Sequence, residues 1–232
     1  MSPSSPILLS TAYLPPVQYI TKFLLGEPVL IEVHENYQKQ SYRNRCYIYG
    51  ANGKQCLVIP VKKHHGEKTP VNQVEIDYQK SWRKIHLKSI ESAYRLSAFY
   101  EYYADDFAGL YDHEIPLLIE WNQKILEKVM QMLGIRQALL TTGKWEDKAS
   151  GYLDYRQSIH PKDRLNKQDP SFTPQPYQQV FRERYGFIPN LSIVDLLFNE
   201  GPEGVSILRR SLRCNPSSEQ SQQDKGDNSH QY

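Results

Sequence analysis

The pattern of apolar and polar positions at the start of the chain predicts a strand, a helix and a second strand. Residues 6–14 (PILLSTAYL) form a short apolar run that leads into Pro15-Pro16, and proline is tolerated in the first turn of a helix. VQYITKFLLG follows with apolar residues at helical spacing, and Gly26 is a typical stop. The run VLIEV at 29–33 predicts the second strand. This order indicates an α/β fold that begins with a parallel pair.

Residues 45–62 alternate around Asn52-Gly53, the strongest short signal for a β-hairpin. With these two residues as the turn, residue 49 pairs with 56 and residue 46 with 59. Because side chains alternate between the faces of a strand, one face is expected in the core: Cys46, Ile48, Leu57, Ile59 and Val61. The other face carries Arg43, Arg45, Tyr47, Tyr49, Cys56 and Val58, and it suits either a second packed layer or the wall of a groove.

The rest of the chain is mostly helical in pattern. Apolar residues at helical spacing predict helices over 79–98 and 116–133, the second ending at Gly134, and a strand over 135–142. A capping box at Ser192-x-x-Asp195 begins a short helix, and Gly201-Pro202 precedes another. The predicted fold class is therefore α/β. A mixed sheet contains the N-terminal strand–helix–strand unit and the hairpin, and a mostly helical C-terminal half follows.

Two long segments lack a regular period. Residues 143–176 are rich in aromatic side chains, which favours an ordered loop that wraps over the domain. Residues 213–232 have almost no apolar content, which predicts a disordered polar tail. We therefore expect a single domain over residues 1–212.

Composition limits the classes of function. The 232 residues carry a net charge of +2, which gives no sign of nucleic-acid or membrane binding. Three cysteines without paired spacing argue against disulfides and zinc, and they indicate a reducing compartment, for which we expect the cytoplasm. No apolar run is long enough for a membrane span, and we expect no signal peptide, because the N-terminal segment lacks a basic region. The usual nucleotide, dinucleotide, serine-hydrolase and zinc motifs are absent, so we predict no metal and no cofactor.

Positive charge is concentrated in one segment. Residues 37–68 contain seven Lys or Arg side chains and one acid, Glu67. Guanidinium groups bind phosphate and carboxylate, and neighbouring tyrosines can stack on a base or a sugar. Arg43, Arg45 and Lys62, with Tyr47 beside them, are therefore candidates for an anion site. The alternative is a solvated edge strand that is protected by charge.

Two histidines are candidates for acid–base chemistry. His86 falls in the middle of the apolar side of the helix over 79–98, so it is either a core histidine or a general base that faces a cleft. His34 and Glu35 follow the second strand, and ligands bind at the carboxyl ends of parallel strands.

Further polar residues have two interpretations each. Asn122, on the apolar stripe of the helix over 116–133, either positions a substrate or makes a structural hydrogen bond. The long loop carries five more candidates, which belong either to a lid over a charged substrate or to a solvated loop: Asp154, Tyr155, Arg156, His160 and Lys162.

Several stretches together resemble one protein family: LLSTAYLPP at 8–16, SYRNRCYI at 41–48, ANGKQCLVIPVKK at 51–63, VEIDY at 74–78 and W-x-x-x-HL at 82–87. The combination is similar to the WbqC-like family. That bacterial family is associated with O-antigen and other surface-polysaccharide gene clusters, and a role in glycine transfer has been suggested for it. DYRQSIHPK at 154–162 and FIPNLSIVDLLFNEGPE at 187–203 resemble its Bacteroidetes version.

The resemblance is uneven along the chain. Positions that keep the family's residues are Tyr13-Leu14-Pro15, Asn44-Arg45, and the pair Trp82 and His86. Leu9-Ser10 replaces a His-Gln, and Val33-His34 replaces a pair of aspartates. The resemblance therefore implies a shared substrate-holding surface that includes Tyr13 and Asn44, more than it implies a shared acid–base mechanism.

Three functions are compatible with these residues. The first is a transferase of O-antigen-type surface-polysaccharide biosynthesis, such as glycine or aminoacyl transfer to a sugar. It would hold a phosphate-bearing small molecule, for example a nucleotide-sugar, with Arg43, Arg45 and Lys62, and use His86 or His34 as the base. The second is a non-catalytic binding or accessory protein of the same pathway. The third is an ATP-dependent ligase of nucleotidyl-transfer type, which rests on fold-level analogy. The sequence predicts no oligomeric state.

Overall fold

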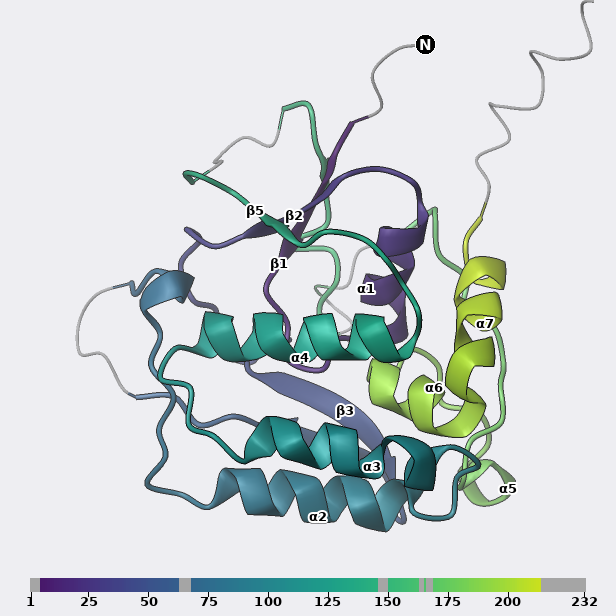
Figure 1. Cartoon of the computed structure of the whole chain (residues 1–232). Coiled ribbons are helices and arrows are strands. Elements are labelled where there is room, and N and C mark those ends of the chain that lie inside the picture. Colours follow the sequence, from purple (N-terminus) through teal and green to yellow (C-terminus); the bar gives the residue numbers. More distant parts are fainter. Residues whose placement is uncertain (1–4, 63–67, 146–149, 163–164, 166–168, 214–232) are drawn as a thin grey trace, which may run out of the picture.

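A computed structural model describes residues 5–62, 68–145, 150–162, 165 and 169–213 of the chain (Figure 1). Strand β1 (Ile7–Ser10) is followed by helix α1 (Val17–Thr21), the 3-10 helix η1 (Lys22–Leu24) and strand β2 (Val29–Glu32). β1 and β2 pair in parallel, with Ile7 opposite Val29 and Ser10 opposite Glu32. Gly26 ends the helical segment with a φ of +86°, in the left-handed region that favours glycine. The predicted strand–helix–strand unit is confirmed.

Two very short strands extend this pair into a four-stranded sheet. β5 (Leu140–Thr141) pairs with β2, and β6 (Leu153–Asp154) pairs with β1, so the order is β5-β2-β1-β6 and every pairing is parallel. β5 covers only the end of the strand predicted over 135–142, and β6 lies inside the predicted loop 143–176. From β1 the chain passes to β2 on one side and later reaches β6 on the other. The carboxyl ends of β1 and β6 therefore flank a topological switch point.

The hairpin forms a separate two-stranded sheet, and its predicted register is wrong by two residues. β3 (Arg45–Gly50) pairs with β4 (Gly53–Val58) so that Tyr49 lies opposite Lys54 and Cys46 opposite Leu57. Ala51 and Asn52 form the turn, and of the pair Asn52-Gly53 only the glycine takes a positive φ, +93°. Because strand side chains repeat every two residues, a shift of two leaves both faces unchanged. The core face is accordingly buried at Cys46, Ile48, Leu57 and Ile59.

Helices make up most of the remaining described chain. α2 (Trp82–Tyr94) and α4 (Leu118–Met132) lie within the predicted helices, whereas α3 (Tyr100–Ala108) and the 3-10 helix η3 (Gly109–Tyr111) between them were not predicted. α5 (Arg182–Tyr185), α6 (Ile193–Glu200), the 3-10 helix η4 (Gly201–Glu203) and α7 (Gly204–Arg210) follow, and η2 (Val71–Gln73) precedes α2. In Figure 1, α4 crosses the molecule with the labelled parallel strands above it and α2 and α3 below. The α/β class with a mostly helical C-terminal half is confirmed.

The predicted capping box at α6 is half present. The Ser192 hydroxyl accepts from the backbone N of Val194, 3.5 Å away, and caps the helix. Asp195, the expected second member, instead accepts hydrogen bonds from Tyr94, Tyr177 and Gln179 in the protein interior.

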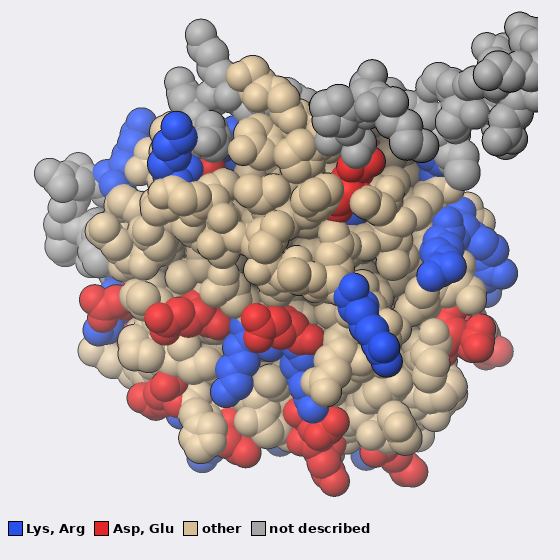
Figure 2. Space-filling model, turned by 45° about the horizontal axis from the view of Figure 1, so that its top comes forward, with Lys and Arg blue, Asp and Glu red and all other residues tan. Residues whose placement is uncertain are grey.

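One apolar cluster reaches from Ile7 in β1 to Leu208 in α7, and aromatic rings lie at its centre. The ring centroids of Trp82 and Trp121 are 5.3 Å apart, edge to face. Figure 2 shows one face, on which most acidic and basic side chains lie in the lower half and at the margins, around a broad area of uncharged residues. Of the helices described, none is long and apolar enough to cross a membrane. The domain extent of 1–212 stays a prediction, and the tail predicted over 213–232 lies, beyond residue 213, outside the described residues.

Candidate functional site

The parallel strands bring polar side chains to one edge of their sheet. β1 ends at Ser10, β2 ends at Glu32, and β6 ends at Asp154. The residues just beyond the strands include His34, Thr142 and Arg156. In open α/β sheets, ligands bind in the crevice outside the carboxyl ends of the strands. We call the following group the carboxyl edge: Ser10, Glu32, His34, Glu35, Arg43, Thr142, Asp154 and Arg156.

Glu32 is the centre of one half of the carboxyl edge. Its side chain is fully buried and lies 3.3 Å from Nη1 of Arg156. It also accepts from the Thr142 hydroxyl at 2.9 Å and from the backbone N of His34 at 2.7 Å. Arg156 turns its Nε and Nη2 toward Asp154, at 3.0 and 2.8 Å from the two carboxylate oxygens. Glu32 and Arg156 thus join strands β2, β5 and β6 at their ends.

Glu35 and Arg43 form the second half. Both side chains are almost wholly buried, and the arginine meets the carboxylate side-on through Nε, at 2.7 Å, and through Nη2. Nη2 also donates to the Ser10 hydroxyl at 2.8 Å, and that hydroxyl donates to the backbone oxygen of Arg156 at 3.1 Å. Ser10 therefore connects the two buried ion pairs across the switch point.

A small hollow lies at the same place. It is lined by Ser10, Thr11, Ala12, Tyr19, Tyr42, Arg43, Tyr155, Arg156 and Ile159, and its volume is about 10 Å³. That volume is close to the minimum for one water molecule. The hollow is therefore too small for a sugar or a nucleotide in this conformation.

Arg45 differs from Arg43 in its surroundings. It is partly exposed and, within the described part of the chain, it pairs with no carboxylate. Its Nε is buried without a hydrogen-bond partner there. Tyr37 and Tyr47 are its neighbours. Burial raises the pKa of Tyr37 to about 12, and the Arg45 and Arg43 charges oppose that rise. Burial also raises the pKa of Tyr47, and a hydrogen bond with Arg45 opposes it.

The two candidate histidines have different environments. His34 is partly exposed, and its Nε2 lies 3.2 Å from the backbone oxygen of Thr142 at the carboxyl edge. His86 is buried in α2, and its Nδ1 lies 2.8 Å from the Tyr13 hydroxyl, which in turn lies 2.7 Å from the Tyr111 hydroxyl. Burial lowers the pKa of His86 to about 4, although a backbone hydrogen bond with Val58 opposes the shift. The carboxyl edge therefore includes His34, whereas His86 and Tyr13 belong to a buried chain of polar contacts among the aromatic rings.

The two asparagines make buried contacts with the backbone. Asn122 donates to the Arg43 backbone oxygen at 2.8 Å and to the Thr11 hydroxyl at 3.1 Å. Asn44 donates to the backbone oxygen of Ile59 at 2.9 Å. Asn122 therefore holds the segment that carries Arg43, and Asn44 holds the start of the hairpin.

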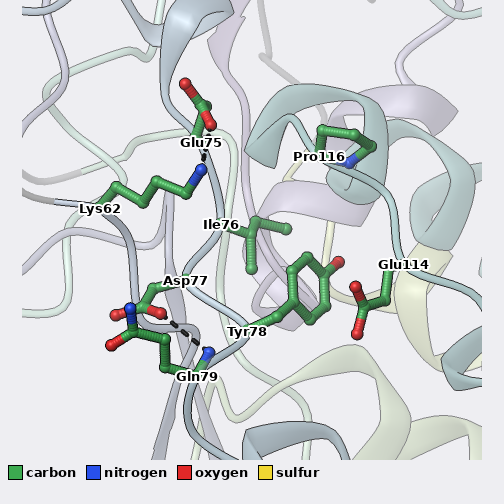
Figure 3. Close-up of a pocket in the computed structure, with 8 residues that line it drawn as sticks. All are labelled: Lys62, Glu75, Ile76, Asp77, Tyr78, Gln79, Glu114 and Pro116. Carbon is green, nitrogen blue, oxygen red and sulfur yellow. Dashed lines mark hydrogen bonds and ion pairs between the residues drawn. The ribbon is translucent and has the colours of Figure 1, made fainter.

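Lys62 lies at a different surface. It pairs with Glu75 at the margin of an open hollow of about 680 Å³, which Asp77, Tyr78 and Glu114 also line. In Figure 3 the Lys62 ammonium points toward Glu75, and the other charged side chains drawn are acidic. None of the residues that line this hollow lines the small hollow at the switch point.

Sequence reasoning missed three of the eight residues of the carboxyl edge. Glu32 had no assigned role beyond its proximity to His34, and Ser10 and Thr142 were not among the candidates. The available signal for these residues was the rule that ligands bind at the carboxyl ends of parallel strands. The rule could be applied only to β2, because β5 and β6 have two residues each and show no alternation of apolar and polar side chains. No group of three or more His, Cys, Asp or Glu side chains in the described residues is arranged to hold a metal ion.

Comparison with known proteins gives one family and one relative. The profile of the WbqC-like protein family matches residues 11–168 and 146–207. Among curated proteins, the chain is similar to "Uncharacterized protein Rv1507c" of Mycobacterium tuberculosis, with 26% identity over 227 residues, which cover 87% of this chain and 96% of that protein. No solved structure matches.

Proposed function

Because the chain belongs to the WbqC-like protein family, we propose that it is a transferase of bacterial surface-polysaccharide assembly that acts at its carboxyl edge. One observation carries the proposal: four parallel strands end together at a group of ionisable side chains. The donor is a phosphate-bearing small molecule such as a nucleotide-sugar, and the acceptor supplies an amine or a hydroxyl, as in glycine transfer to a sugar. The family's association with surface polysaccharides supports the pathway.

His34 is the base in this proposal. Because a carbonyl oxygen can only accept, Nε2 donates to Thr142, and in the neutral form of the ring Nδ1 then keeps its lone pair. That lone pair can accept the proton of an attacking amine or hydroxyl. His86 is the weaker choice, because a histidine whose pKa is lowered to about 4 by burial has little affinity for a proton at neutral pH.

The carboxylates and arginines of the edge position these groups. Glu32 binds the backbone N of His34, so it fixes the turn that carries the base. Arg43 is neutralised by Glu35, and Arg156 by Glu32 and Asp154, so these five ionic groups hold the strand ends in place. Arg45 keeps an uncompensated positive charge for the phosphate-bearing donor.

A panel of nucleotide-sugars and aminoacyl donors, tested with purified protein, examines the proposal. We expect at least one donor to raise the melting temperature and to support transfer, and His34→Ala to lower kcat about 100-fold with a smaller change in KM. His113→Ala is the control, because this histidine is exposed and lies outside the carboxyl edge. A wild-type protein that neither binds nor turns over any member of the panel contradicts the proposal.

A non-catalytic binding protein of the same pathway is the second candidate. The observation that favours it is the small hollow, with a volume of about 10 Å³ between buried groups that already neutralise one another. In that case a donor binds and raises the melting temperature, but no transfer occurs and His34→Ala changes nothing measurable.

A further inference from the structure

One tryptophan of the chain faces solvent at the carboxyl edge. The three tryptophans are Trp82, Trp121 and Trp145. The first two are 3% and 1% exposed, whereas 45% of the surface of Trp145 is exposed. Trp145 follows β5, and the centroid of its ring lies 4.8 Å from Cζ of Arg156. Packing in the apolar core therefore does not account for the position of this ring.

The Arg156 side chain fixes the orientation of the Trp145 ring. Its guanidinium is 5% exposed and lies 3.3 Å from Glu32, and its Nε and Nη2 donate to Asp154 at 3.0 and 2.8 Å. Two carboxylates thus hold the guanidinium at its edges, and the cation lies over the tryptophan ring. The exposed surface of Trp145 lies away from the guanidinium. A ligand that stacks there meets a ring that is already oriented, so little side-chain freedom is lost on binding.

A hydrogen-bond acceptor accompanies the ring. The Asp154 side chain is 33% exposed. A carboxylate has about four acceptor positions, and Arg156 uses three of them through its backbone N, Nε and Nη2. Asp154 can therefore accept a hydrogen bond from a hydroxyl group of a ligand that lies on Trp145.

The charge balance of the carboxyl edge disfavours an anionic ring at this place. Three carboxylates (Glu32, Glu35 and Asp154) pair with two guanidinium groups (Arg43 and Arg156), so these five groups sum to −1. A ring that itself carries a carboxylate would be repelled, because like charges are destabilising at short distance.

We propose that Trp145 is a stacking platform for the pyranose ring of an uncharged sugar. A pyranose has an apolar face of C–H groups and a rim of hydroxyl groups, so it matches an exposed aromatic ring with a carboxylate beside it. A nucleobase also stacks on aromatic rings, but it offers fewer donors to the carboxylate. The proposal deepens the proposed function, on which it rests for the link to surface polysaccharides, because it assigns the sugar of the reaction to one side chain.

Fluorescence quenching of the full-length protein tests the platform directly. Because Trp82 and Trp121 are buried, acrylamide in solution quenches mainly Trp145. The probes are glucose, galactose, rhamnose and N-acetylglucosamine at millimolar concentrations, with glucuronate and uridine for comparison. We expect at least one of the four uncharged sugars to reduce the quenching constant at least twofold, and glucuronate and uridine to reduce it less. Unchanged quenching with all four sugars, or stronger protection by uridine or glucuronate, overturns the proposal.

Two variants separate stacking from a purely structural role of the tryptophan. Trp145→Ala should bind the most protective sugar about tenfold more weakly in a calorimetric titration, which is the scale of one lost aromatic contact. Trp145→Phe keeps an aromatic face and should stay within about threefold of the wild type. The matched control is Tyr102→Ala on α3, where the aromatic side chain is 78% exposed, and it should leave binding unchanged.

Urea unfolding checks that the variants are folded. If Trp145→Ala is unfolded, Trp145→Phe and the quenching of the wild type decide the question. Equal affinity of folded Trp145→Ala and the wild type contradicts the platform.

The outcomes also separate this proposal from the transferase proposal. Protection of Trp145 by a sugar, without turnover of any donor, supports the platform and contradicts the transferase. Turnover with an unchanged KM for the sugar substrate in Trp145→Ala supports the transferase and overturns the platform.

Discussion

The buried ion pair of Glu35 and Arg43 allows a quantitative test of the carboxyl edge. Their side chains are 2% and 3% exposed, so Glu35→Gln leaves the arginine charge buried without its counter-charge. Removing one partner of a buried pair costs about 3–5 kcal/mol in the free energy of unfolding. For a chain of this size, 1 kcal/mol changes the melting temperature by about 2–4 °C. We therefore expect Glu35→Gln to melt roughly 6–20 °C below the wild type.

A surface pair provides the control for this experiment. Asp106 in α3 lies 3.0 Å from Lys128 in α4, but the carboxylate is 65% exposed. Asp106→Asn should cost less than about 1 kcal/mol, because exposed pairs contribute little. Urea unfolding and calorimetry of both variants give the comparison. The double variant Glu35→Leu/Arg43→Met should be more stable than Glu35→Gln, because it leaves no unpaired charge. A Glu35→Gln protein as stable as Asp106→Asn would refute the description of the pair as buried and essential.

Three other predictions follow from the interior. Burial raises the pKa of Asp195 to about 6, so the folded protein binds a proton more tightly than the unfolded chain, and this group's contribution to stability is present below about pH 4 and is lost as the pH rises through 6. Asp195→Asn should remove this part of the dependence of unfolding free energy on pH, measured by unfolding experiments from pH 4 to 7. An unchanged dependence contradicts the assignment. Tyr13→Phe should destabilise the protein by about 1–3 kcal/mol in urea, since it leaves buried His86 and Tyr111 without a shared partner, whereas Tyr102→Phe, at a residue that is 78% exposed, should have little effect. Gly201→Ala should lower the melting temperature more than Gly134→Ala. Both glycines have positive φ, but only at Gly201 would the new Cβ lie 2.5 Å from the Phe99 ring. Equal decreases in melting temperature would show that backbone conformation alone sets the loss of stability.

The sequence predicts an element well where its apolar pattern is long or where a proline or glycine marks its end. The apolar run before Pro15 predicts β1. Gly26, which has a positive φ in the structure, marks the end of the helical segment that follows. The faces of the hairpin were predicted correctly despite a wrong register, because the error was an even number of residues. α3 was missed because a tyrosine-rich segment with adjacent acids gives no clear apolar stripe.

The candidate site was less accessible to sequence reasoning because its contacts join distant segments. Glu32 meets Arg156, and Ser10 meets both Arg43 and Arg156, through a sheet whose outer strands have two residues each. Local pattern predicted the cationic segment and the position of His34 at a strand end. It could not show which arginine would be neutralised, since the partner of Arg43 follows β2 and that of Arg156 ends β2.

The difference between Arg43 and Arg45 is what turns a basic segment into a specific expectation about binding. A guanidinium already held side-on by a buried carboxylate can accept a new anion only by exchanging partners, and that exchange leaves Glu35 buried and charged. Arg45 requires no such exchange, because no carboxylate pairs with it in the described part of the chain. Arg43 is therefore a structural arginine that keeps the strand ends together, and we expect the phosphate of the proposed donor to bind on the side of Arg45. Loss of binding with intact stability in Arg45→Gln, against loss of stability in Glu35→Gln, is the pattern that this division of roles requires.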